Sequence, residues 1–207
     1  MSYELFIAAL SILSVTNLLL LVLFKSEIID GVILILNFVL SMIFMADFLY
    51  RLSESKPKKK YLIKEYGWID FLASLPFAQL KILRLFRLFR AGKIMRKYGT
   101  KRLIREFLSS RGASALLTIF FLAICVLEFG GIAILLAERG AENANIKTPS
   151  DALWWIFTTI TTVGYGDRFP VTNPGRIVGV IVMITGIGVF GTLTGFLANA
   201  FLEPKKK

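Results

Sequence analysis

The most informative segment of the chain is TPSDALWWIFTTITTVGYGD, which occupies residues 148–167. It opens with the signals of a helix start, because Thr148 can cap the helix, Pro149 suits the first turn and Asp151 stands three residues after the cap. A helix from Pro149 to Ile160 would be about 18 Å long, too short to cross a hydrocarbon core of roughly 30 Å. Since long apolar runs flank it, we expect this segment to enter a membrane and return.

The residues after this short helix carry glycine at alternate positions, Gly164 and Gly166. Successive carbonyls can face one axis only if the backbone alternates between right- and left-handed conformations, and glycine permits the left-handed ones. The C-terminal end of the helix would point into the membrane, where its aligned peptide dipoles favour a cation. The pattern therefore predicts a cation site made of backbone oxygens. The alternative is a glycine-rich turn before a strand of a soluble protein.

Composition indicates a membrane protein. The chain has 207 residues, of which 56% are hydrophobic, and a formal charge of +11 from 25 Lys plus Arg against 14 Asp plus Glu. The basic residues fall in short bursts between long apolar runs, as in cytoplasmic loops, rather than along one solvated face as in a nucleic-acid binder. The expected partner is thus a lipid bilayer. With no histidine and one cysteine, Cys125, zinc and ordinary hydrolytic chemistry are disfavoured, and so is an enzyme.

Apolar runs predict the membrane spans, and Lys and Arg predict their direction. The basic stretches 51–64, 96–111 and 205–207 should all be cytoplasmic, so an even number of crossings must separate them. That parity requires the basic segment 81–96 to cross as well. We expect an all-α membrane protein with six transmembrane helices, one re-entrant loop and both termini cytoplasmic. The apolar runs are Leu5–Phe24, Gly31–Tyr50, Tyr66–Leu80, Gly112–Ala137 and Ile177–Leu202.

The expected fourth span carries a cation at every third position. Charges inside a bilayer are costly and are usually functional. Asp47 and Asp70, which interrupt the second and third apolar runs, are candidate partners that would lower this cost. The alternative is a basic amphipathic helix that lies on the cytoplasmic surface of the membrane. The six cations are Lys81, Arg84, Arg87, Arg90, Lys93 and Arg96.

Taken together, these motifs resemble the voltage-gated potassium channels. In that family an acid three residues after a phenylalanine on the second helix forms a charge-transfer site, which Phe44 and Asp47 match, and Asp70 matches the acid of the third helix. The regularly spaced cations resemble the voltage-sensing fourth helix. Asn37 departs from the pattern, because many members carry an outer acid there. The likeness covers nearly the whole chain.

The same resemblance assigns roles to the segment after the short helix. Residues 162–166 match the selectivity filter of potassium channels, in which backbone carbonyls replace the hydration shell of K⁺. One strand cannot encircle an ion, so a homotetramer of four identical subunits is implied. K⁺ would bind at Thr162, Val163, Gly164 and Tyr165, with Gly166 closing the motif.

Flanking residues are expected to support the filter. By similarity, Trp154 should brace Asp167, Trp155 should pack on Tyr165, and Glu138 should anchor the outer pore loop. The two tryptophans would alternatively form part of an interfacial aromatic belt. Outside the filter, Phe169 matches a binding position for external tetraethylammonium. A ring of four Arg168 side chains would oppose such a cationic blocker.

Gating would involve the last helix. Gly186 matches the hinge glycine of the family, whereas Gly191 and Gly195 suit close helix packing. The absence of proline between residues 177 and 202 resembles prokaryotic channels. An amphipathic helix before Gly112 would lie at the interface and either pull on the gate or anchor the chain passively. These features divide the chain into a voltage-sensor-like domain (1–96), a linker helix (97–112) and a pore domain (113–207) with a re-entrant loop at 148–170.

We therefore expect a voltage-gated potassium channel that conducts K⁺ passively across the plasma membrane, with no cofactor, small-molecule substrate or nucleic-acid partner. One alternative is a ligand-regulated potassium channel of the same fold, for example one controlled by a cyclic nucleotide, since the sequence ends at Lys207 directly after the last span. A more distant alternative is a basic protein that binds membrane surfaces or nucleic acid. A requirement for detergent during extraction would argue against it.

Overall fold

The structure is a computed structural model of the 207-residue chain. It describes residues 2–24, 26–55, 57–64, 66–75, 86, 89, 92, 96, 99 and 113–202. The chain divides into two compact units, Met1–Ser110 and Arg111–Lys207. The boundary falls inside the linker expected at 97–112. Of that linker the structure describes Gly99, and the other residues lie outside the described part.

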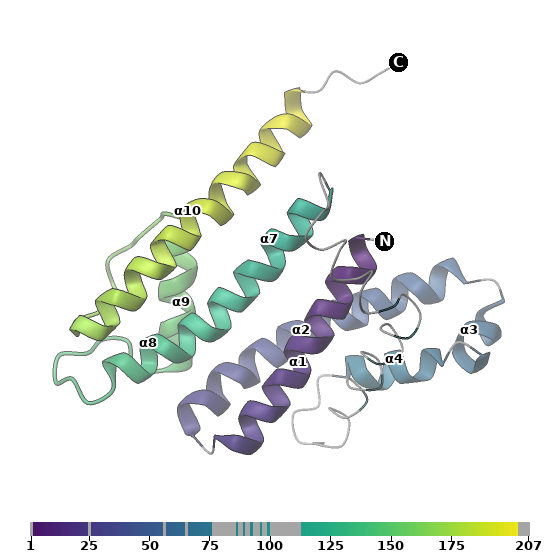
Figure 1. Cartoon of the computed structure of the whole chain (residues 1–207), viewed down its shortest axis with the longest axis horizontal. Coiled ribbons are helices and arrows are strands. Elements are labelled where there is room, and N and C mark those ends of the chain that lie inside the picture. Colours follow the sequence, from purple (N-terminus) through teal and green to yellow (C-terminus); the bar gives the residue numbers. More distant parts are fainter. Residues whose placement is uncertain are drawn as a thin grey trace. The chain divides into compact units, whose positions relative to one another are not determined.

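The first unit is built on two long helices that run side by side in opposite directions (Figure 1). These are α1 (Ser2–Leu23) and α2 (Glu27–Glu54). α2 is longer than the apolar run that predicted it, because Glu27 and Asp30 in its first turn and Arg51 in its last complement the helix dipole beyond the apolar stretch. The fully buried residues Leu10, Val32 and Phe44 lie in the core of this unit.

Two short helices follow. α3 (Lys58–Lys64) forms within the basic stretch that the sequence analysis treated as a loop, and α4 (Gly67–Ser74) packs against α2 and α3. Tyr66 precedes α4 in the left-handed conformation, with φ 54°. A side chain at Gly67 would collide with the ring of Tyr61, so glycine permits the close contact between the two short helices.

The second unit contains two long helical stretches with a short helix packed against both (Figure 1). The first stretch runs continuously through α7 (Ala113–Cys125), the π-helical segment η1 (Val126–Gly130) and α8 (Gly131–Glu138). The short helix α9 spans Pro149–Ile160, and α10 spans Asn173–Leu202. The π-helical turn was not predicted. It contains Glu128, whose side chain is fully buried.

Within the described residues, four helices are long and apolar enough to cross a membrane. They correspond to the first, second, fifth and sixth predicted spans. The third is described only as α4, since residues 76–80 lie outside the described part, as does most of 81–96. The count of six therefore stays a prediction. The four helices are Tyr3–Leu23, Glu27–Glu54, Leu116–Glu138 and Asn173–Asn199.

Candidate functional site

The short helix α9 begins as the sequence predicts. The Thr148 hydroxyl accepts the Asp151 N–H (3.1 Å), and Asp151 Oδ2 accepts the N–H groups of Thr148 (3.0 Å) and Lys147 (3.2 Å). This reciprocal arrangement satisfies N–H groups that have no partner within the helix. The cap therefore fixes where α9 starts and which way its C-terminal end points.

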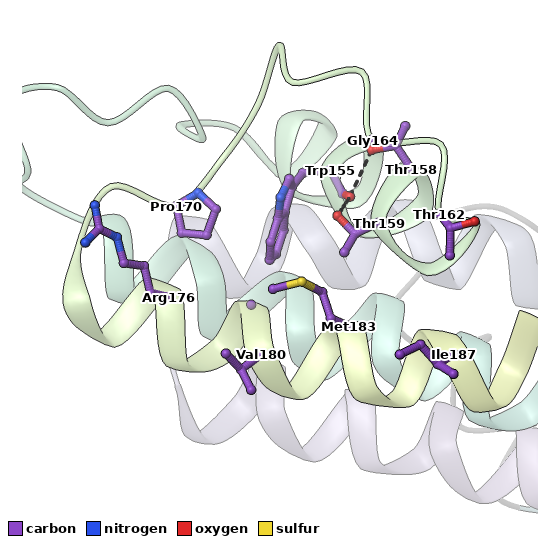
Figure 2. Close-up of a pocket in the computed structure, with 11 residues that line it drawn as sticks. Trp155, Thr158, Thr159, Thr162, Gly164, Pro170, Arg176, Val180, Met183 and Ile187 are labelled. Carbon is purple, nitrogen blue, oxygen red and sulfur yellow. Dashed lines mark hydrogen bonds between the residues drawn. The ribbon is translucent and has the colours of Figure 1, made fainter.

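The end of α9 holds the loop that follows it. The Thr158 carbonyl accepts two hydrogen bonds, from the N–H groups of Val163 (3.0 Å) and Gly164 (3.1 Å). Figure 2 shows Gly164 beside Thr158, at the end of α9. Because these N–H groups point back toward the helix, the loop cannot swing away from it without losing both bonds.

The backbone of this loop has positive φ at every second residue, with values of 60° at Thr162, 55° at Gly164 and 77° at Gly166. The predicted conformations of the two glycines are confirmed. Thr162 was not predicted, because a side chain makes the left-handed region unfavourable by about 1–2 kcal/mol. Such a residue persists when its surroundings hold it in place, which is common at functional sites.

Side chains of the loop face outward from the single chain. Val163 is 56% exposed and Tyr165 is 68% exposed. Large apolar side chains with this exposure indicate a surface that another molecule covers.

Trp154 supports the loop in two ways. Its ring stacks on Tyr165 with centroids 5.5 Å apart and planes 8° from parallel, and its indole N–H donates to Asp167 Oδ2 (2.9 Å). The predicted contact between Trp154 and Asp167 is thus present. Within one chain, the ring that stacks on Tyr165 is that of Trp154, whereas we expected Trp155. Successive helix residues point about 100° apart, so Trp155 is buried on another face of α9.

Glu138 holds the segment beyond the loop, as expected. Its carboxylate is buried and accepts the N–H groups of Val171 (3.0 Å) and Thr172 (3.0 Å) and the Thr172 hydroxyl (2.8 Å). A Cβ at Gly175 would overlap the Glu138 carboxylate, which explains the glycine there. This contact joins the end of α8 to the start of α10.

Two further contacts hold the residues directly after Asp167, and sequence reasoning missed both. Arg168 Nε lies 3.0 Å from Asp151 Oδ1, and the Phe169 N–H donates to Asn145 Oδ1 (3.1 Å). The Phe169 ring is 51% exposed. Neither contact joins residues close in sequence, so spacing carried no signal for them.

A cavity of about 610 Å³ lies between α9 with its loop and α10. Figure 2 shows Trp155, Thr159 and Thr162 on one side of it and Met183 and Ile187 on the other. Its lining is mostly apolar.

Gly186 of α10 allows the two helices to approach each other closely. A Cβ there would lie 2.8 Å from the Ile160 Cα, at the end of α9. Packing therefore accounts for this glycine, independently of the hinge role expected for it. By contrast, a Cβ at Gly191 or Gly195 would meet nothing within 4 Å in the single chain.

In the first unit, the acids expected to serve as counter-charges are buried. Asp47 is 1% exposed and lies one turn beyond the buried Phe44. Its Oδ1 accepts the Tyr3 hydroxyl (2.7 Å) and Arg51 Nε (2.9 Å), while Arg51 Nη2 lies 2.6 Å from Glu4 Oε2. Arg51 was not predicted as a partner, although its four-residue spacing from Asp47 on a helix favours such a pair.

Asp70 is also buried, and its Oδ2 accepts the Tyr61 hydroxyl (2.9 Å). Burial, with the nearby charge of Asp70, raises the pKa of Tyr61, so its hydroxyl stays protonated and donates. Of the predicted sensor cations, Arg96 is described and exposed. Phe86, from the same segment, packs edge-on against Trp68 with centroids 6.0 Å apart. The other five cations, Lys81, Arg84, Arg87, Arg90 and Lys93, lie outside the described residues.

Comparison with known proteins finds relatives that are named as potassium channels or as subunits of them. A voltage-gated potassium channel of Aeropyrum pernix is 45% identical over 73 residues, 35% of this chain and 25% of that protein. A calcium-gated potassium channel of Thermoplasma volcanium is 37% identical over 97 residues, which are 47% of this chain and 28% of that protein. A voltage-gated potassium channel regulatory subunit of Homo sapiens is 26% identical over 184 residues, and the match covers 77% of this chain and 42% of that protein. The chain thus spans between 25% and 42% of the length of these relatives.

The family model described as ion transport protein matches residues 1–207, the whole chain. This match and the relatives confirm the resemblance drawn from the motifs, and they indicate a channel and not an enzyme. The chain, with its apolar helices and its capped α9, belongs to the ion transport protein family.

Proposed function

We propose that the chain is one of four identical subunits of a potassium-selective channel that conducts K⁺ passively across the plasma membrane. The observation that carries the proposal is the alternation of positive φ at Thr162, Gly164 and Gly166. With the N–H groups of the loop engaged by Thr158, its carbonyls are available to replace the water around a dehydrated K⁺. K⁺ would bind at residues 162–165, within the filter at residues 162–166.

Four copies are proposed because one chain supplies carbonyls from one side only. The exposed Val163 and Tyr165 supply a surface for neighbouring copies to cover. The dipole of α9 would add partial negative charge near the bilayer centre, where a cation most needs it. Both termini would be cytoplasmic, following the distribution of Lys and Arg.

The filter must stay open to the ion without collapsing when the ion leaves. We assign this support to Trp154, Trp155, Asp167 and Glu138. The stacked Trp154 ring and its bond to Asp167 hold the outer half of the loop, and Glu138 holds the segment after it. These contacts would keep the carbonyls at a spacing that suits K⁺.

For gating, we propose that residues 1–96 form a voltage sensor in which the cations at 81–96 move past Phe44, Asp47 and Asp70. The burial of these two acids supports the proposal, because a buried carboxylate lowers the cost of a cation in the bilayer. One charge that crosses the full field contributes roughly 2.3 kcal/mol per 100 mV. The linker at 97–112 would transmit the movement to α10, which would bend at Gly186.

The decisive experiment is reconstitution of the purified chain in planar bilayers with K⁺ on one side and Na⁺ on the other. We expect the current to reverse at a voltage far from zero, with the sign that K⁺ crossing much more readily than Na⁺ would give. Equal passage of Na⁺ and K⁺ would refute the selective pore, and a failure to cross-link as four copies would refute the assembly. Substituting Arg87 or Arg90 with glutamine should flatten the conductance–voltage curve. An unchanged slope for both variants would refute voltage sensing while leaving the pore intact.

A second candidate is a potassium channel that a ligand opens. The calcium-gated relative of Thermoplasma volcanium, 37% identical over 97 residues, favours it. Voltage steps and additions of Ca²⁺ or a cyclic nucleotide, applied to the same bilayer, separate the candidates. Opening that follows the ligand and ignores the voltage would favour the second.

A further inference from the structure

The five residues from Asp167 to Val171 are tied at nearly every position to a different part of the second unit. Asp167 accepts from Trp154, Arg168 pairs with Asp151, the Phe169 N–H donates to Asn145 and the Val171 N–H donates to Glu138. Pro170 has no N–H to donate. The segment that leaves the filter is therefore fixed by several independent contacts, and among these five residues the pair of Arg168 with Asp151 is the ion pair that the structure describes.

The Asp151 carboxylate serves two purposes at once. Oδ2 accepts the N–H groups of Thr148 and Lys147 and thereby caps α9, whereas Oδ1 is 3.0 Å from Arg168 Nε. A carboxylate at the N-terminus of a helix is favoured by the helix dipole, so it stays ionised for the arginine. The pair consequently joins the start of α9 to the outer end of the loop that follows the same helix.

We propose that Arg168 is a positioning residue, whose ion pair with Asp151 clamps the outer end of the filter to the start of α9 and lengthens the time for which the pore conducts. This inference rests on the proposed function. The clamp acts beside the Trp154–Asp167 hydrogen bond, one residue earlier, so two ties from one helix hold consecutive residues. Their combination resists rotation of the outer loop, which a single tie would permit.

The same pairing changes what Arg168 presents at the pore mouth. A ring of four unpaired guanidinium groups would repel cations that approach the filter. Each guanidinium lies instead against a carboxylate of its own chain, which cancels most of its field at the distance of the pore axis. Arg168 is thus compatible with entry and exit of K⁺.

The expected size follows from exposure. The side chains of Arg168 and Asp151 are 37% and 18% exposed, so the pair is partly screened by water. Pairs of this kind change an equilibrium by about two- to five-fold. We therefore expect Arg168→Gln to shorten the mean duration of open bursts by about two- to five-fold, with the K⁺-to-Na⁺ permeability ratio unchanged.

The experiment compares single-channel records of Arg168→Gln, Asp151→Asn and the double variant in planar bilayers. Asparagine retains one oxygen that can still accept the capping N–H groups, so Asp151→Asn removes the ion pair while preserving the cap. The two changes should be non-additive, because either one breaks the same contact. Arg168→Lys keeps the charge and should recover part of the burst duration. Arg139→Gln, at an exposed arginine at the end of α8, is the matched control and should behave as the parent.

A second readout does not depend on current. Hydrogen exchange of the peptide that contains Phe169 should be faster in Arg168→Gln than in Arg139→Gln, since the neighbouring tie is lost. Additive burst effects, or unchanged bursts and exchange, would overturn the clamp. If the parent protein passes no K⁺ but the exchange difference is found, the clamp is supported and the proposed function fails, so the two failures are distinguishable.

Discussion

The two units use buried polar groups differently. In the second unit, Glu138, Trp154 and Asp151 bind backbone or side-chain groups of a loop that must keep one shape. In the first unit, the buried Asp47 accepts from side chains alone among its described hydrogen bonds, those of Tyr3 and Arg51. Backbone partners such as those of Glu138 fix a geometry, whereas a cation on a long flexible side chain such as Arg51 can be replaced by another cation. The difference suits a rigid filter and a sensor in which cations replace one another.

The largest expected effect tests the rigid side of this contrast. Gly164→Ala places a Cβ on a residue with φ 55°, although nothing lies within 4 Å of that position in the single chain. The left-handed backbone then costs about 1–2 kcal/mol per residue, repeated in every subunit of the pore. We expect K⁺ conduction in bilayers to be abolished.

Gly188→Ala is the matched control, because its Cβ also meets nothing within 4 Å and its φ is not positive. It should conduct like the parent. Normal conduction by Gly164→Ala would show that the alternating backbone is not required.

The next effect concerns Glu138, the anchor of the segment after the filter. In Glu138→Gln the side-chain amide turns an N–H toward groups that all donate, so at least one buried donor loses its acceptor. Leaving a buried donor without its acceptor costs about 1–3 kcal/mol. Thermal unfolding in detergent should show this loss, against about 0.5 kcal/mol or less for Glu142→Gln at an exposed position. Equal melting temperatures would contradict the anchor.

The third prediction tests whether the cation partner of Asp47 in the first unit can be replaced, and it concerns Arg51. Arg51→Gln removes the cation beside Asp47 and Glu4, so in the proposed sensor these acids would attract the cations of residues 81–96 more strongly. If this added attraction differs by about 1 kcal/mol between the two end states of the sensor, and three charges move, the conductance–voltage midpoint shifts by about 15 mV with the slope unchanged. The shift should favour the state in which the cations lie at the cytoplasmic end. Lys60→Gln, on exposed α3, should leave the midpoint in place.

The sequence predicts a structural feature well when neighbouring residues determine it, and poorly when distant contacts do. The start of α9 and the conformations of Gly164 and Gly166 follow from neighbouring residues, and both were predicted correctly. The conformation of Thr162 was not predicted, because it accompanies hydrogen bonds that the Thr158 carbonyl accepts from the two residues after it, Val163 and Gly164. The π-helical turn around Glu128 carries no distinctive residue pattern, since such turns depend on tertiary packing.

Long-range partners show the same limit. The contact of Arg51 with Asp47 could be read from a four-residue spacing, but its contact with Glu4 joins residues 47 positions apart. The pairing of Arg168 with Asp151 likewise depends on how α9 and its loop fold back together. The contacts of Glu138 and of Trp154 with Asp167 were anticipated through the family resemblance, which carries tertiary information that composition and periodicity lack.

A smaller effect concerns the exposed aromatic ring at the mouth. Four Phe169 rings around the proposed pore axis would share one external tetraethylammonium ion, and at this exposed site the cation–π contact contributes about 0.5–1 kcal/mol in all. Phe169→Val should therefore weaken external block by about two- to five-fold. Block of the K⁺ current at a series of concentrations measures this. Unchanged block would mean that Phe169 does not face the entrance.

The smallest effect is a dependence on external pH at Asp151. Partial burial alone would raise the pKa of this carboxyl, but hydrogen bonds from Lys147 and Thr148 and the charge of Arg168 hold it below the ordinary value of 3.8. A depressed pKa means that the stabilisation is fully present above the ordinary value and is lost as the pH falls through the lowered one. Burst durations should consequently be constant from neutral pH down to about 4 and shorten only below that. Asp151→Asn should lack this acid limb, because it has no carboxyl at the position to protonate. An identical loss at low pH in the variant would assign the dependence to another group and would contradict the predicted ion pair between Arg168 and Asp151.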